Sequence, residues 1–302
     1  MSQEPAAPPP PGVIPDFSNP SGGLHFWLIV TQCICIPVVT CVVITRLYTK
    51  LFVQHLFYVE DWMCVISWIL ATIWFSLHLV SASGGGGYHQ WDIPKDNTFL
   101  FFKTNYIINI LYGPVILTVK LSILFMIARL FAAYRRWVAF IHMFSAVLVA
   151  YTVSTFVVKI RICNPIDTYW LGPEATNGTC LNVLLVFLAD TTFSVVTDLV
   201  IIALPITLIS LLHLSLMKKL RVIFLLAAGG LVCIVTIVRL VWVIIYQDSV
   251  DRTWTTTRTD LVTCAEIAVG IIGACVPSIY FLVNQRCQRC SLSSLGDREG
   301  GT

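Results

Sequence analysis

The fold of this chain is decided by LNVLLVFLADTTFSVVTDLVIIALP, residues 181–205. This run exceeds the roughly 20 residues that a helix needs to cross the hydrocarbon core of a bilayer, and it carries two carboxylates, Asp190 and Asp198. The loop before it, CNPIDTYWLGPEATNGTC (residues 163–180), has a cysteine at each end and one N-glycosylation sequon. We therefore expect a membrane helix with ionisable groups at membrane depth, preceded by a loop in an oxidising compartment.

Composition indicates a polytopic membrane protein. Of the 302 residues, 57% are hydrophobic and only 12% are charged, whereas about 25% of a soluble domain is charged. Nothing in the charge pattern indicates a nucleic-acid-binding surface. Residues 1–23 hold seven of the 14 prolines and no Lys or Arg, which predicts a disordered extracellular tail and not a secretory signal.

Seven apolar runs follow the tail, each long enough to span a bilayer. A helix satisfies its own backbone polar groups in lipid, so we expect an all-α bundle of seven transmembrane helices over residues 24–285. The apolar residues 206–216 exceed the fifth span, and Pro205 is expected to bend them into the cytoplasmic interface. The predicted spans are 24–44, 62–80, 106–127, 137–158, 181–205, 222–246 and 261–283.

The Lys and Arg residues between the spans predict the orientation. With the N-terminus outside, eleven of them are cytoplasmic and six, Lys159 among them, are outside. The only N-x-Ser/Thr sequon, at Asn177, falls in a loop that this count places outside, so we expect an N-glycan there and a disulfide between Cys163 and Cys180. The C-terminus is then cytoplasmic, and the expected location is the plasma membrane.

Ionisable side chains inside the spans cost about 2.5–3.5 kcal/mol each unless they are paired or hydrated. Their positions along the helices put Lys120 level with Asp198, towards the cytoplasmic side, and Arg239 level with Glu266, in the outer third. We expect two ion pairs. Asp190, at mid-depth, is left without an obvious cation.

Two interpretations of these charges stay open. The pairs either lock the bundle together, or Asp190, Arg239 and Glu266 line a hydrated cavity that opens to the outside. An outer loop with the sequence GGGGYHQWDIP, residues 84–94, bears on the same question. It either caps the bundle or contacts a ligand or metal through His89, with Trp91 beside it. It is not a phosphate-binding loop, because no strand precedes it, and we predict no metal site.

The last span excludes a retinal pigment and predicts no cofactor. Retinal requires a Schiff-base lysine in the last helix, and residues 261–283 contain no lysine. The short cytoplasmic tail, residues 286–302, begins with Cys287 and Cys290 beside two arginines. These cysteines are either palmitoylated or simple reduced thiols.

The order of several motifs resembles the fungal rhodopsin-domain integral membrane proteins, over roughly residues 24–285. This family includes receptor-like seven-helix proteins and members encoded near specialised-metabolite pathways. The resemblance implies an architecture rather than a chromophore or an activity. The matching residues are Gly85, Gly87, His89, Trp91 to Pro94, Lys120, Arg129, Cys163, Pro165, Trp170, Cys180, Asp198, Pro205, Gly230, Arg239, Glu266, Gly270 and Pro277.

Three functional classes are left open, and all share the lipid bilayer as a partner. First is a receptor-like protein that senses a small extracellular molecule and has a cytoplasmic signalling partner. Its ligand would contact His89, Trp91, Asp190, Arg239 and Glu266 in a pocket in the outer half. Second is an accessory or catalytic membrane protein of a fungal specialised-metabolite pathway, with Asp190 or Glu266 as a general acid. Third is a transporter. Whether the protein is an enzyme is left undecided.

Overall fold

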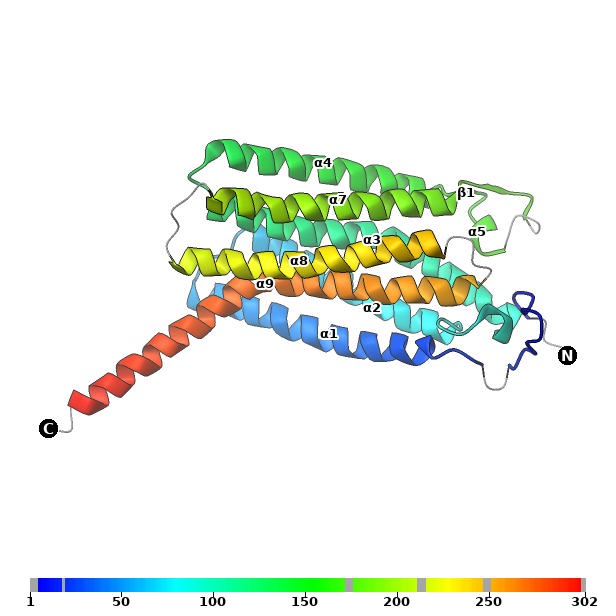
Figure 1. Ribbon diagram of the computed structural model, residues 1–302, viewed down its shortest axis with the longest axis horizontal. Coiled ribbons are helices and arrows are strands. Elements are labelled where there is room, and N and C mark those ends of the chain that lie inside the picture. The colour runs from blue at the N-terminus through cyan, green and yellow to red at the C-terminus, as the bar shows by residue number, and fades with distance from the viewer. Residues whose placement is uncertain (1–4, 18–19, 172–175, 211–215, 247–250, 300–302) are drawn as a thin grey trace.

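A computed structural model describes residues 5–17, 20–171, 176–210, 216–246 and 251–299. Within them, seven helices are long and apolar enough to cross a membrane, and they lie side by side as one bundle (Figure 1). The all-α seven-helix fold is therefore confirmed, while the side of the membrane that each end faces stays a prediction. The helices are α1 (Leu24–Tyr48), α2 (Val59–Ser83), α3 (Lys95–Leu130), α4 (Arg135–Ile160), α7 (Val183–Ser210), α8 (Leu216–Ile245) and α9 (Arg252–Glu299).

Helix α3 belongs to both hydrophobic clusters of the bundle. One cluster joins α3 to α1, α2 and α9, with Trp74 at its centre; the indole of Trp74 donates to the carbonyl of Ile108, 3.1 Å away. The other joins α3 to α4 and α7. Gly270 lets α9 approach α3, since a Cβ at this position would lie only 2.9 Å from Val119 Cγ1. Large apolar side chains on the outward faces of α4 and α8 stay exposed, as expected for surfaces that contact lipid.

The loop between α4 and α7 is closed by a disulfide between Cys163 and Cys180, as predicted. The two cysteines also face each other in a short antiparallel pair of strands, β1 (Cys163–Asn164) and β2 (Thr179–Cys180), with the short helix α5 (Thr168–Leu171) between them. Asn177 lies exposed just before β2, with a φ of 48°. Its side chain is open to solvent, and its glycosylation stays a prediction.

The N-terminal segment differs from the predicted disordered tail. Residues 5–17 and 20–23 lie against the outer loop between α2 and α3 instead. The amide of Ala6 donates to the carbonyl of Ile93, at 3.1 Å. The carboxylate of Asp92 accepts the backbone N–H groups of Asp16 at 3.2 Å and Ser21 at 3.1 Å. The buried carboxylate of Asp92 thus binds backbone N–H groups of a segment whose composition alone does not predict an ordered structure.

Several helices continue past their apolar runs. Helix α3 begins at Lys95 rather than at residue 106, and α9 begins at Arg252 rather than at residue 261. Polar sequence extends a helix when its first turn is capped, and Asp251 Oδ1 caps α9 by accepting the N–H of Trp254 at 3.3 Å. Hydrophobicity alone therefore marks the membrane-length part of each helix and not its ends.

Helices that extend past their apolar runs also bear on two predictions about the segments expected to be cytoplasmic. Helix α7 continues through Pro205 to Ser210. Residues 211–215 of the segment expected at the interface lie outside the described residues, so the bend expected at Pro205 stays a prediction. Helix α9 continues to Glu299, and its last part leaves the bundle (Figure 1). Cys287 and Cys290 fall in this part, where side chains lie outside the described structure.

Candidate functional site

The centre of the bundle holds both predicted ion pairs. Lys120 Nζ on α3 lies 2.9 Å from Asp198 Oδ1 on α7. Arg239 Nη1 on α8 lies 3.0 Å from Glu266 Oε2 on α9. All four side chains are at most 8% exposed. Each pair therefore joins two different helices by a buried contact between opposite charges.

Asp190 also has a cation, contrary to the sequence-based expectation. Lys159 Nζ lies 2.5 Å from Asp190 Oδ2, and it also donates to the carbonyl of Asn109 at 3.1 Å. Lys159 was expected in the outer loop, but α4 extends to Ile160 and includes it in the last turn. A lysine at the end of an apolar run can bend its flexible stem inwards as well as towards water. The structure therefore contains a third ion pair, between α4 and α7.

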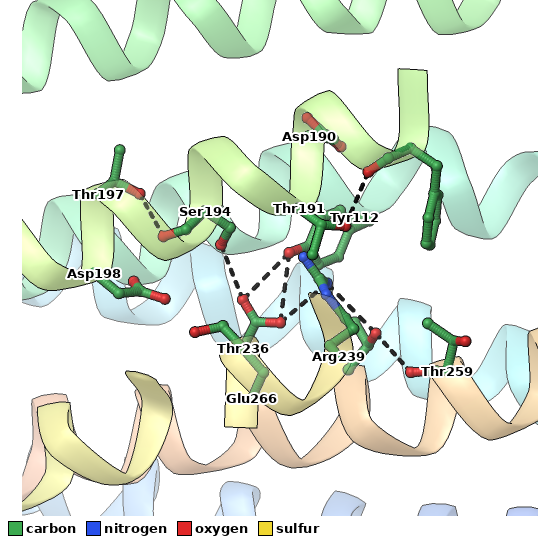
Figure 2. A network of polar contacts seen from close by, with 12 residues as sticks. Tyr112, Asp190, Thr191, Ser194, Thr197, Asp198, Thr236, Arg239, Thr259 and Glu266 are labelled. Atoms are coloured by element: carbon green, nitrogen blue, oxygen red, sulfur yellow. Dashed lines mark hydrogen bonds and ion pairs between the residues drawn. The ribbon is translucent and has the colours of Figure 1, made fainter. Parts of the chain in front are cut away.

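Ser194 and Tyr112 connect the three pairs into one network, and Figure 2 shows the contacts of both side chains with Glu266. Lys120 Nζ donates to Ser194 Oγ at 3.0 Å, and Ser194 donates in turn to Glu266 Oε1 at 3.2 Å. The hydroxyl of Tyr112 donates to the same oxygen, also at 3.2 Å. The Tyr112 ring faces both remaining cations, with Arg239 at 4.7 Å and Lys159 at 5.5 Å from its centroid. The network thus spans α3, α4, α7, α8 and α9.

The two predicted ion pairs lie at one level of the bundle. Ser194 Oγ lies 3.0 Å from Lys120 Nζ and 3.2 Å from Glu266 Oε1, so one short side chain reaches both pairs. The depth of Glu266 in the membrane stays a prediction.

Some polar atoms of the network have no hydrogen-bond partner within the described residues. They include Asp198 Oδ2 and Arg239 Nη2, which are fully buried. A cavity of about 40 Å³ borders Lys120, Asp198 and Glu266, and one of about 30 Å³ borders Tyr112 and Asp190. Such volumes hold a water molecule or a small polar group. In this conformation Asp190 and Glu266 border separate small cavities rather than one wide opening.

The glycine-rich loop between α2 and α3 forms a second polar centre. His89 Nδ1 lies 2.5 Å from Asp251 Oδ2, and the imidazole stacks on Trp91 with ring centroids 4.6 Å apart. The backbone N–H of Gln90 donates to the other oxygen of Asp251 at 3.1 Å. The loop is therefore tied to the first turn of α9, which agrees with its interpretation as a cap. Among the described residues, no group of three or more metal-binding side chains is present.

The tight packing of this loop accounts for one of its glycines. Gly87 has a φ of 89°, and a Cβ there would collide with the backbone of His25. His25 in turn lies 2.8 Å from the carbonyl of Gly86 through Nδ1 and stacks on Tyr88. Only glycine allows both the left-handed backbone and this close approach.

The five predicted ligand-contact residues thus fall into two groups. Asp190, Arg239 and Glu266 belong to the central network, while His89 and Trp91 belong to the outer cap. Asp251, the partner of His89, precedes Glu266 by 15 positions on α9, which corresponds to roughly 22 Å of helix. The cap and Glu266 are therefore far apart along the bundle.

A partly buried tyrosine lies in the disulfide-closed loop. The ring of Tyr169, on α5, lies 5.3 Å from the ring of Tyr106 on α3. Burial raises the pKa of Tyr169 to about 12. Its phenol therefore stays protonated at physiological pH and adds no charge at this end of the bundle.

A further ionic cluster, missed in the sequence, lies at the opposite end of the bundle. Arg46 Nη2 lies 2.6 Å from Asp61 Oδ1, and Arg129 Nη1 lies 2.7 Å from Glu60 Oε1. Glu60 and Asp61 lie in the first turn of α2, which begins at Val59 rather than at residue 62. The available signal was the acidic pair itself, because acidic residues are favoured in the first turn of a helix.

Comparison with known proteins identifies relatives over most of the chain. The model of the fungal rhodopsin domain family matches residues 45–285. A SAT4 family membrane protein of Emericella nidulans is 31% identical over 197 residues, which are 65% of this chain and 49% of that protein. Fugralins biosynthesis cluster protein 2 of Gibberella zeae is 23% identical over 288 residues, 91% of this chain and 69% of that protein. The chain therefore spans about half the length of the first relative. No solved structure matches it significantly.

Proposed function

Because the chain belongs to the fungal rhodopsin domain family, we propose that it is a receptor-like seven-helix membrane protein without retinal that senses a small extracellular molecule. Its seven apolar helices make it a multi-pass membrane protein. Its location in the plasma membrane and its signalling partner at the cytoplasmic ends of the helices are parts of the proposal.

The observation that supports this proposal is the network of three ion pairs that links α3, α4, α7, α8 and α9. Charges at membrane depth are costly and are usually functional. Each pair fixes the contact between two helices, and Ser194 makes the arrangement of one pair depend on the other. A molecule that competes for these groups would therefore change several helix contacts together, as a receptor requires.

The geometry suggests a route by which a molecule would act. The cap formed by His89 and Asp251 closes the outer end, and it must open before a molecule from outside reaches the network. Inside, the molecule would replace water in the small cavities and satisfy acceptors such as Asp198 Oδ2. The free energy for the change comes from the difference in affinity between the closed and open states.

A second candidate function follows from one relative. The Gibberella zeae protein is described as a biosynthesis cluster protein, so this chain is alternatively an accessory or catalytic protein of a specialised-metabolite pathway. The network contains buried carboxylates, such as Glu266, that such a catalyst could use as a general acid. Transport of a solute through the bundle is the third candidate.

The experiment compares wild type with Ser194→Ala, which removes the bridge between two ion pairs but keeps both pairs. Purified protein is screened by thermal unfolding against a library of small molecules. The matched control is Ser154→Ala, because Ser154 is exposed on α4 and bonds only within its own helix, to the carbonyl of Ala150. Molecules that stabilise the wild type and the control should lose most of their effect on Ser194→Ala.

Three results would contradict the proposal. Equal stabilisation of Ser194→Ala would show that the network does not respond to the molecule. Consumption of a stabilising molecule by the purified protein would favour the pathway enzyme. Its accumulation in sealed vesicles that contain the protein would favour the transporter.

A further inference from the structure

We propose that the ionic cluster at the end of the bundle opposite the disulfide is a binding site for a phosphate group. The cluster lines a cavity of about 310 Å³ between the end of α1, the π-helical turn η1 (Thr49–Val53), the start of α2, the end of α3 and α9. This proposal does not depend on the sensing function.

The charges at the cavity do not balance. Arg46, Lys50 and Arg129 supply three cations, whereas Glu60 and Asp61 supply two carboxylates. Arg46, Lys50, Glu60 and Asp61 are at most 7% exposed. A net positive charge on mostly buried side chains is unfavourable unless an anion accompanies it.

Lys50 is the cation that lacks a close partner. Its Nζ lies 3.8 Å from Glu60 Oε1 and 3.8 Å from Asp61 Oδ2, beyond hydrogen-bond distance. Both carboxylates are already held at shorter range by Arg129 and Arg46. No hydrogen bond from Lys50 Nζ to another described residue is present, although an ammonium carries three N–H donors. The cavity beside it has room for an acceptor.

Other donors face the same cavity. Arg129 uses Nη1 to bond Glu60, and its guanidinium carbon lies over the Tyr58 ring, 3.4 Å from the centroid. This stacking fixes the guanidinium and leaves its further N–H groups for in-plane acceptors. Ser278 and Gln54, which carry a hydroxyl and an amide, are also among the residues that line the cavity.

This combination of donors suits phosphate. A phosphate group offers three or more oxygen acceptors in a compact tetrahedron, and arginine and lysine together are its usual protein ligands. Water could satisfy the donors of Lys50, but it could not neutralise the excess charge. The phosphate belongs either to a lipid headgroup, since the cavity lies at the end of the membrane-spanning bundle, or to a phosphate ester in solution.

The experiment uses the full chain in a phosphate-free maltoside detergent and measures thermal unfolding. Inorganic phosphate is added against chloride at matched ionic strength, and phosphatidic acid is added against diacylglycerol, the same lipid without phosphate, in mixed micelles. Stabilisation by phosphatidic acid alone would identify a headgroup site. Stabilisation by both phosphate and phosphatidic acid would identify a site that also accepts phosphate from solution.

The variant Lys50→Met should weaken the affinity for the stabilising probe at least tenfold, the equivalent of about 1.4 kcal/mol. The control is Arg136→Gln, which removes a cation from the same end of the bundle at an exposed position outside the cavity; it should keep the wild-type affinity. If Lys50→Met does not fold, Arg129→Gln serves instead, because the Arg129 side chain is 36% exposed. Unchanged affinity in the variant, or no stabilisation by either probe, would overturn the proposal.

Discussion

Lys159 on α4 and Asp190 on α7 form a buried ion pair, with 2.5 Å between Nζ and Oδ2. Their side chains are 7% and 10% exposed. A second side chain of α4, Tyr151, stacks on Phe193 of α7 with ring centroids 3.5 Å apart. The ion pair and this stacking together hold α4 against α7 in the half of the bundle nearer the disulfide.

A double-mutant cycle tests this pair. Removal of one partner, as in Lys159→Met or Asp190→Asn, leaves a buried charge or an unsatisfied donor and should cost about 3–5 kcal/mol of stability. The double variant should cost less than the two single variants together. Unfolding in denaturant measures all four proteins. Strictly additive losses would show that the two side chains do not interact. The control is Lys103→Met, which removes a different cation, on α3. Lys103 has no ion-pair partner among the described residues.

The disulfide should stabilise the outer loop between α4 and α7. Cys163 and Cys180 close a loop with a sequence separation of 17, and a loop of this length corresponds to about 3 kcal/mol. Cys163→Ser/Cys180→Ser should therefore unfold at a lower temperature than the wild type. Cys33→Ser, at an exposed free cysteine, should not. A non-reduced digest with both thiols free would contradict the bond itself.

The sequon tests the orientation, which the geometry of the bundle alone does not determine. Asn177 is exposed in the disulfide-closed loop, so the secretory pathway should add a glycan if this loop faces the outside. The protein should run faster on a gel after glycosidase treatment, and Asn177→Gln should run at the faster position without treatment. An unmodified Asn177, together with a C-terminus accessible from outside, would reverse the predicted topology.

The fold was predictable from the sequence because two features are sufficient to predict most of it. These are the lengths of the apolar runs and the positions of the charged residues along them. Apolar runs located all seven helices, and helical rise alone paired Lys120 with Asp198. The ends of the helices were not predictable, since they depend on caps such as Asp251 and on contacts between loops. Because the predicted end of α4 was too early, Lys159 was assigned to a loop and was not recognised as the partner of Asp190. Because the predicted start of α2 was too late, Glu60 and Asp61 were not recognised as part of its first turn.

The outer cap should open when its central contact is removed. His89→Ala deletes the contact with Asp251 and the stacking on Trp91, so the glycine-rich loop should exchange its backbone amides faster. The central network lies roughly 22 Å further along α9 and should keep its protection. Hydrogen exchange followed by mass spectrometry measures both regions. His142→Ala, on α4 outside the cap, is the control. Equal exchange in His89→Ala and wild type would show that the backbone alone holds the cap closed.

Tyr112→Phe separates the packing role of the network from its proposed role in sensing. The change keeps the ring that faces Arg239 and Lys159 and removes only the hydroxyl that donates to Glu266. Hydrogen bonds between membrane helices contribute about 0.6 kcal/mol on average, so the loss of stability should be small. The response to a stabilising small molecule should fall much more, because Glu266 then has one donor fewer to position it. Tyr134→Phe, at an exposed tyrosine after α3, is the control. Thermal unfolding with and without the molecule measures both quantities, and a response that falls only in proportion to stability would assign Tyr112 to packing alone.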